Sequence, residues 1–334
     1  MGCMGPIPRR PLRGLCVGAL MAMTAATALA HGSAAPVPTV LSSLTTWEPD
    51  PLPWLMAVVA ASWYLLAVCR VNGANPRVPV PRWRIAAWLA GVAAILIALA
   101  SAIDVYAADL LTVHMVQHLV LTMVAPPLLA LGAPVTLLLR DVSPRTRHRL
   151  VLPLLHSRVV RVVASPIVAW SLFAIVMFLT HFSPLYNAAL EDPSLHVAEH
   201  MVYLATGLIF WWPLVAADPI PGRMGYGTRL AYVGLQMPIS AAVGLAIYFS
   251  PTVIFPHYAT LIRTWCPSAL VDQQVGGVVM WGVGDLVMLA MVPLIVTAWM
   301  RADARRTVRS DARLSASRAA EAARPAADEP VVSG

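Results

Sequence analysis

The stretch Leu110–Pro134, LLTVHMVQHLVLTMVAPPLLALGAP, decides how the rest of the chain is interpreted. It is long and apolar enough to cross the roughly 30 Å hydrocarbon core of a bilayer as a helix. It also carries two histidines, His114 and His118, spaced one helical turn apart. Polar side chains that face lipid are costly, so this face must point into a protein interior. The stretch therefore predicts a membrane helix with a buried polar face.

The composition agrees with a membrane protein. The chain has 334 residues, of which 59% are hydrophobic and 12% charged, and its mean hydropathy is +0.72. The net charge of +7 comes from arginines placed between apolar blocks, as the positive-inside rule predicts, so we expect no nucleic-acid partner. Four scattered cysteines predict neither a disulfide framework nor a redox site.

The fold class predicted is an all-α, seven-transmembrane-helix bundle that follows an N-terminal signal peptide. The apolar windows fall near 52–69, 83–103, 110–139, 162–182, 195–216, 228–249 and 275–300. Residues 1–30 have the charge pattern of a signal peptide that ends in an A-x-A site, Ala28-Leu29-Ala30. An uncleaved first helix is the alternative. The prediction then gives an outer segment at 31–50 and a membrane domain at 51–300.

Loop charges give the orientation. The basic connections are 70–82, 140–161 and 217–227, and the tail at 301–334 is basic as well. Alternate basic connections belong on the cytoplasmic side, which places the N-terminus outside and predicts a multi-pass protein of the cell (plasma) membrane. From its composition we expect the cytoplasmic tail, 301–334, to be solvated and disordered, with a partly helical segment at the membrane surface as the alternative.

A second polar face opens the window at 195–216. The sequence LHVAEHMVYLATGLIFWWP repeats the first arrangement, with His196 and His200 four residues apart and Glu199 between them. The predicted orientation puts both histidine pairs near the outer ends of their helices, where they can meet.

Four imidazoles and one carboxylate predict a metal site made by His114, His118, His196, His200 and Glu199. Copper or zinc fits this donor set better than iron, because helical di-iron sites use several carboxylates. The alternative is a set of hydrogen-bonded core histidines without a metal. Met115 and Met201 point about 100° away from their neighbouring histidines, so we expect them to pack rather than to ligate.

Other polar residues fall on the same side. Gln117 is a candidate partner of the histidines, whereas Asp272 and Gln273 either cap the last helix or hydrogen-bond the cluster. Asp104 is interpreted as a loop charge, with contact to the site as the alternative. If cleavage follows Ala30, His31 offers an α-amine and an imidazole that together could chelate one Cu(II).

These blocks resemble a known family, the seven-span CtaG-type cytochrome c oxidase assembly proteins. The resemblance runs from Trp47 to Trp299 and is carried by HMVQHLVLTMVAPPLLALGAP, HVAEHMVYLATGLIFWWP and DQQVGGVVMWGVGD. It implies copper as the metal and a haem-copper oxidase subunit as the partner, with an outer-side copper donor and the lipid bilayer as further partners. It picks out the two histidine pairs, with Gln117, Glu199, Asp272 and Gln273 as polar companions.

Three other functions use the same residues. A copper importer would line a path with them, and a haem-binding membrane protein would use facing histidines as axial ligands. A zinc metallohydrolase would use HVAEH as an inverted zincin motif, with Glu199 as the general base. A copper carrier needs no turnover, so we expect a protein that is not an enzyme.

Overall fold

The computed structural model describes residues 39, 45–219, 223–261 and 267–322, which form helices and one isolated bridge between Trp47 and Ser101. The predicted signal peptide, His31 and Cys266 lie outside these residues. The α-helices and π-helical segments (η) are α2 (Pro51–Ala74), α3 (Arg82–Ala100), α4 (Ala102–Ala107), α5 (Leu111–Leu119), η1 (Val120–Val124), α6 (Ala125–Leu131), α7 (Pro134–Asp141), α8 (Pro144–Thr146), η2 (Arg147–Val151), α9 (Leu152–Leu155), α10 (Arg158–Val163), α11 (Pro166–His181), α12 (Leu185–Glu191), α13 (Pro193–Val215), α14 (Tyr226–Phe249), α15 (Pro256–Thr260) and α16 (Ala269–Ala322).

Five helical stretches are long and apolar enough to cross a membrane: α2, α3, Leu111–Asp141, α14 and α16. Helices α11 and α12 form a sixth candidate if this pair, bent by 67°, counts as one span. Helix α13 is outside this set because the polar residues of its first turns lower its hydropathy. The chain is therefore an all-helical membrane protein, and the count of seven crossings stays a prediction.

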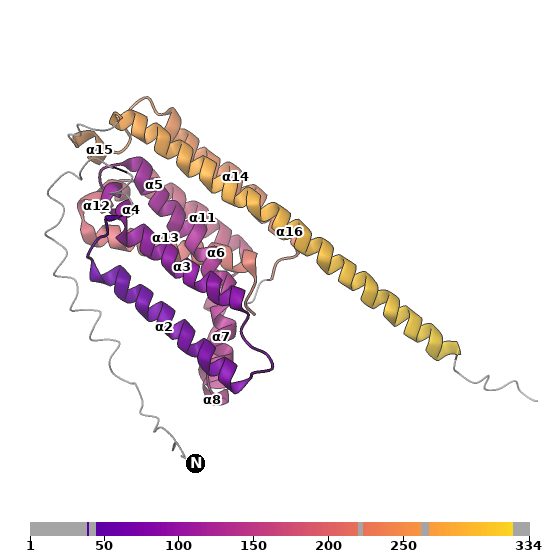
Figure 1. Cartoon of the computed structure of the whole chain (residues 1–334). Helices are drawn as coiled ribbons and strands as arrows, with labels where there is room; N and C mark the ends of the chain where they lie inside the picture. The colour runs from indigo at the N-terminus through magenta and orange to yellow at the C-terminus, as the bar shows by residue number, and fades with distance from the viewer. Residues whose placement is uncertain (1–38, 40–44, 220–222, 262–266, 323–334) are drawn as a thin grey trace, which may run out of the picture.

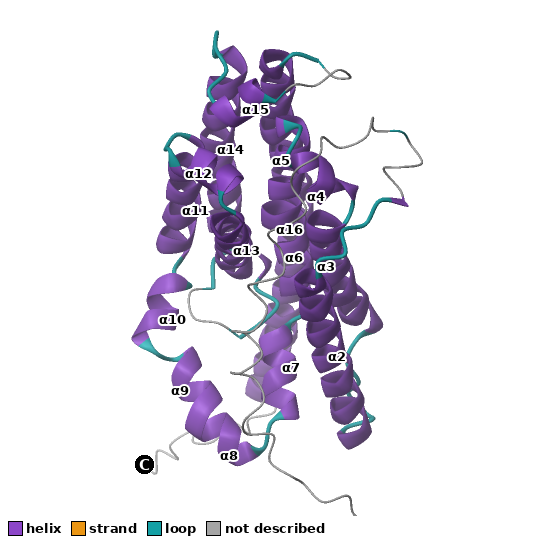
Figure 2. Cartoon of the chain, turned by 90° about the vertical axis from the view of Figure 1, so that its left-hand side faces the viewer, coloured by secondary structure: helices purple, strands orange, loops and turns teal. Residues whose placement is uncertain are grey.

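The bundle has two ends of different chemistry (Figures 1 and 2). Helices α4, α12 and α15 lie at one end, which we call the histidine end because both histidine pairs lie near it. Helices α7 to α10 lie at the opposite end, which we call the arginine end. It carries Arg145, Arg147, Arg149, Arg158 and Arg161.

The third apolar window is broken where its prolines predict a break. Pro126 and Pro127 have no backbone N–H, so the carbonyl of Thr122 loses both its i+4 and its i+5 donor. The chain widens into η1 at this point. The indole N–H of Trp211, on α13, donates to the Thr122 carbonyl at 2.8 Å and so satisfies it from another helix. This bond fixes the position of α13 against the third window.

Two glycines bring the main helices close together. A Cβ atom on Gly207 of α13 would lie 2.8 Å from Pro126 Cγ and 2.9 Å from the Thr122 carbonyl oxygen. A Cβ on Gly277 of α16 would lie 2.7 Å from the Gly244 carbonyl oxygen of α14. Each contact allows two backbones to approach, as small residues do in membrane helix pairs. The Gly207 contact holds α13 against η1 and α6, the segments that follow the helix of His114 and His118.

The first part of the tail is helical. Residues 301–322, for which the composition predicts disorder or a partly helical segment, continue α16 as one helix to Ala322 (Figure 1). Alanine and arginine are strong helix formers, and propagating an existing helix avoids the cost of nucleation. Pairs such as Asp303 and Arg306, three residues apart, add charge support along the helix.

Candidate metal centre

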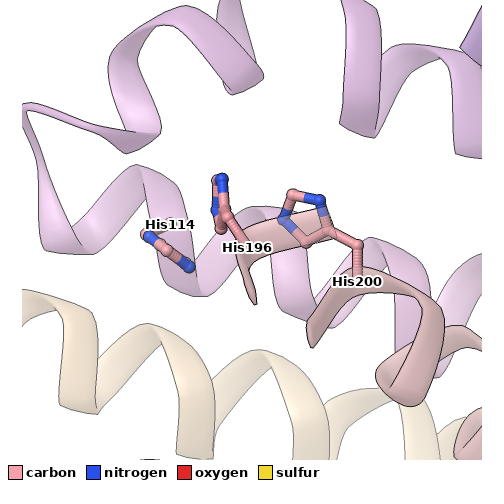
Figure 3. Close-up of side chains that lie close together, drawn as sticks. All are labelled: His114, His196 and His200. Atoms are coloured by element: carbon pink, nitrogen blue, oxygen red, sulfur yellow. The ribbon is translucent and has the colours of Figure 1, made fainter. Parts of the chain in front are cut away.

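The structure brings the two histidine pairs together. His114 and His118 lie on α5, and His196 and His200 lie on α13. Figure 3 shows the His114 ring near that of His196, with His200 one turn further along; the His114 and His196 ring centroids are 5.4 Å apart. Ligand atoms of His114, His196 and His200 all lie within 4.8 Å of one another. The same limit holds for His114, His118 and Glu199.

Glu199 lies where one cation would bind both its carboxylate and the imidazoles of His114 and His118 on α5. Its Oε2 atom is 4.0 Å from His114 Nε2 and 3.9 Å from His118 Nε2, too far for a hydrogen bond to either imidazole. First-row metals bind imidazole nitrogen and carboxylate oxygen at about 2.0 Å, so an ion midway would reach both partners. Glu199 is 7% exposed, and a buried carboxylate needs a compensating charge. The donor set and its spacing fit a divalent or monovalent transition metal.

Hydrogen bonds set the tautomers on α5. The Tyr258 hydroxyl donates its only proton to the Ala107 carbonyl at 2.9 Å, so it accepts from His114 Nδ1, also at 2.9 Å. His114 Nε2 therefore carries a lone pair, which accepts from His118 Nε2 at 2.8 Å. His118 Nδ1 is buried without a partner among the described residues. His118 can thus free Nε2 for a metal by moving its proton to Nδ1.

His181, which belongs to neither histidine pair, joins the cluster. It ends α11, is 2% exposed, and its ring centroid lies 6.1 Å from that of His118. Tyr203 packs on His118 with ring centroids 4.2 Å apart, and its hydroxyl donates to Thr180 at 2.6 Å. A lone histidine has no i,i+4 partner, so the local pattern gave no signal for His181.

Gln117 faces away from the imidazoles. Its Nε2 donates to the Ala98 carbonyl at 2.9 Å and to Asp104 Oδ1 at 2.6 Å, so it ties α5 to α3 and α4. Asp104 is thus the partner of Gln117 rather than a solvated loop charge. Burial raises the pKa of the Asp104 carboxyl to about 7, against the opposing effect of the Gln117 hydrogen bond.

Asp272 and Gln273 hold the frame around the cluster. Asp272 accepts from the backbone N–H groups of Leu111 at 2.8 Å and Thr112 at 3.2 Å. It therefore caps the N-terminus of α5, whereas the sequence predicted either a cap on the last helix or a hydrogen bond to the histidine cluster. Gln273 accepts from the Ile254 N–H at 2.7 Å and donates to the Thr252 carbonyl at 3.1 Å, which fixes the loop before α15.

The remaining described histidines lie apart from the cluster. His148 and His156 are exposed at the arginine end. His257 lies at the histidine end, but its Nε2 contacts the Ala108 carbonyl at 3.2 Å. Of the two methionines considered with the pairs, Met115 is 1% exposed and packs in the core.

Comparisons with known proteins identify the family. The chain is 32% identical over 256 residues to an uncharacterized protein of Mycobacterium bovis, Mb0105, and 31% identical over 257 residues to one of Mycobacterium leprae, ML1998. Each alignment covers 75% of this chain and 38% of the relative, so the chain spans about two fifths of the length of these relatives. No solved structure matches the chain. The model of the cytochrome c oxidase caa3 assembly factor family, Caa3_CtaG, matches residues 62–302, and the chain therefore belongs to this family.

Proposed function

We propose that the protein binds copper at the histidine end and delivers it to a haem-copper oxidase during assembly. In this proposal the helices cross the plasma membrane seven times, with the histidine end outside and the arginine end in the cytoplasm. The positive-inside rule supports that orientation, because the exposed arginines gather at the end opposite the cluster. The signal peptide at 1–30, cleavage before His31 and an outer copper donor belong to the same proposal.

The observation that carries the proposal is the spacing of Glu199 from the α5 pair. Distances of 4.0 and 3.9 Å leave room for an ion that binds the carboxylate and an imidazole at once. His200 supports this, because its Nε2 is buried with no partner among the described residues. Imidazole is a neutral ligand that protonation can displace, so copper held in this way can be passed on by ligand exchange.

Copper is preferred to zinc for two reasons. The family assembles an oxidase that contains copper, and copper binds nitrogen ligands more tightly than zinc in the usual order of divalent affinities. The family assignment gives no support to the haem-binding or metallohydrolase alternatives. For an importer, polar groups would have to continue toward the arginine end, and η1 and α6 continue the third window with mainly apolar side chains.

The test is metal analysis of purified protein after copper loading and removal of loose copper by a chelator. A variant with His114, His118, His196 and His200 changed to alanine should retain less copper than the wild type, because the cluster ligands are gone. The matched control changes His148 and His156, which are exposed at the arginine end, and should retain it. Unchanged copper in the cluster variant, or normal oxidase activity in cells that carry it, contradicts the proposal.

A further inference from the structure

A small cavity lies directly beside the histidine cluster, among α5, η1, α11, α14 and α16. Its volume is about 20 Å³, enough for one water or one ion, since about 10–15 Å³ suffices for a water. His118 and His181 line it. The cavity and the proposed copper centre therefore share the residue His118.

Four methionines line the same cavity: Met115, Met123, Met177 and Met280. They come from α5, η1, α11 and α16, and their exposed fractions are 1%, 4%, 8% and 6%. Methionine often only fills gaps in a core, and sequence analysis assigned Met115 to packing because it points away from the histidine face. In the structure Met115 nevertheless lines the cavity together with the other three methionines. We call this space the methionine cavity.

His181 supplies a nitrogen lone pair to the methionine cavity. Its Nδ1 lies 2.8 Å from the Met177 carbonyl, which can only accept, so Nδ1 carries the proton. Nε2 therefore carries the lone pair, and it is buried without a partner among the described residues. The amide oxygen of Gln236, another residue of the cavity wall, is also buried without one. A buried acceptor without a partner destabilises the fold, and a bound cation would remove that penalty.

We propose that the methionine cavity is a second copper site, specific for Cu(I), with thioether ligands and His181. Thioethers are soft ligands that select Cu(I) over Cu(II) and zinc. No carboxylate lines the cavity wall among the described residues, and a monovalent ion needs less compensating charge than a divalent one. His118 borders both sites and links them. The inference rests on the proposed copper function. In it, the cluster with Glu199 has the harder donor atoms, and the cavity has the softer ones.

Binding requires no electron transfer. Copper arrives as Cu(I), and the thioethers and the His181 imidazole replace the ligands of its donor one by one. Each step forms one Cu–S or Cu–N bond and breaks one bond to the leaving ligand, so no oxidant or reductant is consumed. The neutral tautomer of His181 already has its lone pair on Nε2, so no proton has to leave either.

X-ray absorption at the copper edge tests this inference on the full chain in detergent, loaded with Cu(I) without oxygen. The wild type should show both sulfur and nitrogen neighbours of copper. The variant M115L/M123L/M177L/M280L should lose the sulfur neighbours, because leucine conserves volume but has no sulfur. The matched control is Met288→Leu, a fully buried methionine of α16 that does not line the cavity, and it should keep them. Wild-type protein with only nitrogen or oxygen neighbours overturns the inference without any variant.

Two further variants separate this inference from the proposed function. The triple variant H114A/H196A/H200A removes cluster ligands but leaves His118, His181 and the methionines, so copper with sulfur neighbours should remain. If the triple variant retains all its copper while the methionine variant loses the sulfur-bound ion, the cluster fails and the cavity stands. If the methionine variant binds as much Cu(I) as the wild type, the cavity fails and the cluster stands. Single Met177→Leu, which conserves volume and should lower the sulfur contribution without abolishing it, serves if the quadruple variant does not fold.

Discussion

His156 and His181 make the same local bond at opposite ends of the bundle. The Nδ1 atom of each lies close to the carbonyl four residues earlier, 2.7 Å from Leu152 and 2.8 Å from Met177. His156 is exposed, so water can reach its Nε2. His181 is 2% exposed, and its Nε2 has no partner among the described residues. Burial against other helices, not residue type or local bonding, distinguishes a potential ligand from a surface histidine.

The same contrast holds for charge. At the arginine end, Arg70 and Asp141 form a bidentate ion pair in which the arginine side chain is 57% exposed. At the histidine end, Glu199 is buried, and within the described part of the chain its only ion-pair partners are two imidazoles. We therefore expect substitutions near the histidine end to have large effects and substitutions at the arginine end to have small ones.

The largest effect on stability is expected from Gly207→Ala. A Cβ there meets Pro126 and the Thr122 carbonyl at less than 3.0 Å, so α13 must move away, at a cost of about 1–3 kcal/mol. Unfolding in mixed detergent micelles measures the loss. Gly227→Ala in α14 is the control, since no atom lies within 4 Å, and it should stabilise by up to about 1 kcal/mol. Equal effects of the two changes would mean that the close approach at Gly207 is unimportant.

Glu199→Gln should weaken copper binding by at least about 10- to 100-fold, because removing even a group that only orients a metal ligand has an effect of that size. The same change removes a buried carboxylate, so the metal-free protein should become no less stable. Competition with a copper chelator measures the affinity, and thermal unfolding measures the stability. Glu191→Gln, on an exposed residue at the end of α12, should change neither. Equal affinity in Glu199→Gln and the wild type would exclude the carboxylate as a ligand.

Trp211→Phe should cost about 1–2 kcal/mol. The change removes the only side-chain donor described for the Thr122 carbonyl, which the two prolines leave without a helical partner. Trp83→Phe, on a residue that is 54% exposed, provides the control. A cost no greater than that of the control would show that the carbonyl is satisfied in another way.

Asp104→Asn should flatten the pH dependence of stability between about pH 4 and 7. The folded pKa of about 7 exceeds the unfolded value of about 3.9. The folded state therefore keeps a proton that the unfolded state loses, and stability falls as the pH rises through this window. After allowance for partial solvent exposure, the fall is about 1 kcal/mol. Unfolding curves at several pH values measure this fall. If the same pH dependence persists in Asp104→Asn, another group causes it.

Arg70→Ala should have the smallest effect, below about 1 kcal/mol, because exposed ion pairs contribute little. Added salt should reduce even that difference. Unfolding at low and high salt provides the measurement. A loss that exceeds those of Gly207→Ala and Trp211→Phe would reverse the proposed contrast between the two ends.

The sequence predicted most of the cluster because its signals are local. Four-residue spacing placed each histidine pair on one face, and loop charges placed both faces at similar depth. The structure then brought together all five predicted ligands, and Asp272 and Gln273 proved to support the neighbouring backbone. The break at Pro126 also followed from a local rule, the missing proline N–H.

The remainder depended on contacts between distant segments. His181 and Tyr258 have no periodic partner, so nothing in the sequence indicated that α11 and α15 would bring them to α5. The bond from Gln117 to Asp104 required knowledge of how α4 folds back on α5. The methionine cavity was hidden for the same reason, because its four sulfurs come from four separate elements.

The length of α16 links the two sides of the molecule. Its 54 residues form a rod of about 81 Å at 1.5 Å per residue, much longer than a hydrocarbon core of about 30 Å is thick. Asp272 in its first turn caps the helix that carries His114 and His118, while its last turns extend well past the arginine end (Figure 1). A protein that binds those last turns would thus hold one end of a single long helix whose other end is hydrogen-bonded to α5, the helix of His114 and His118.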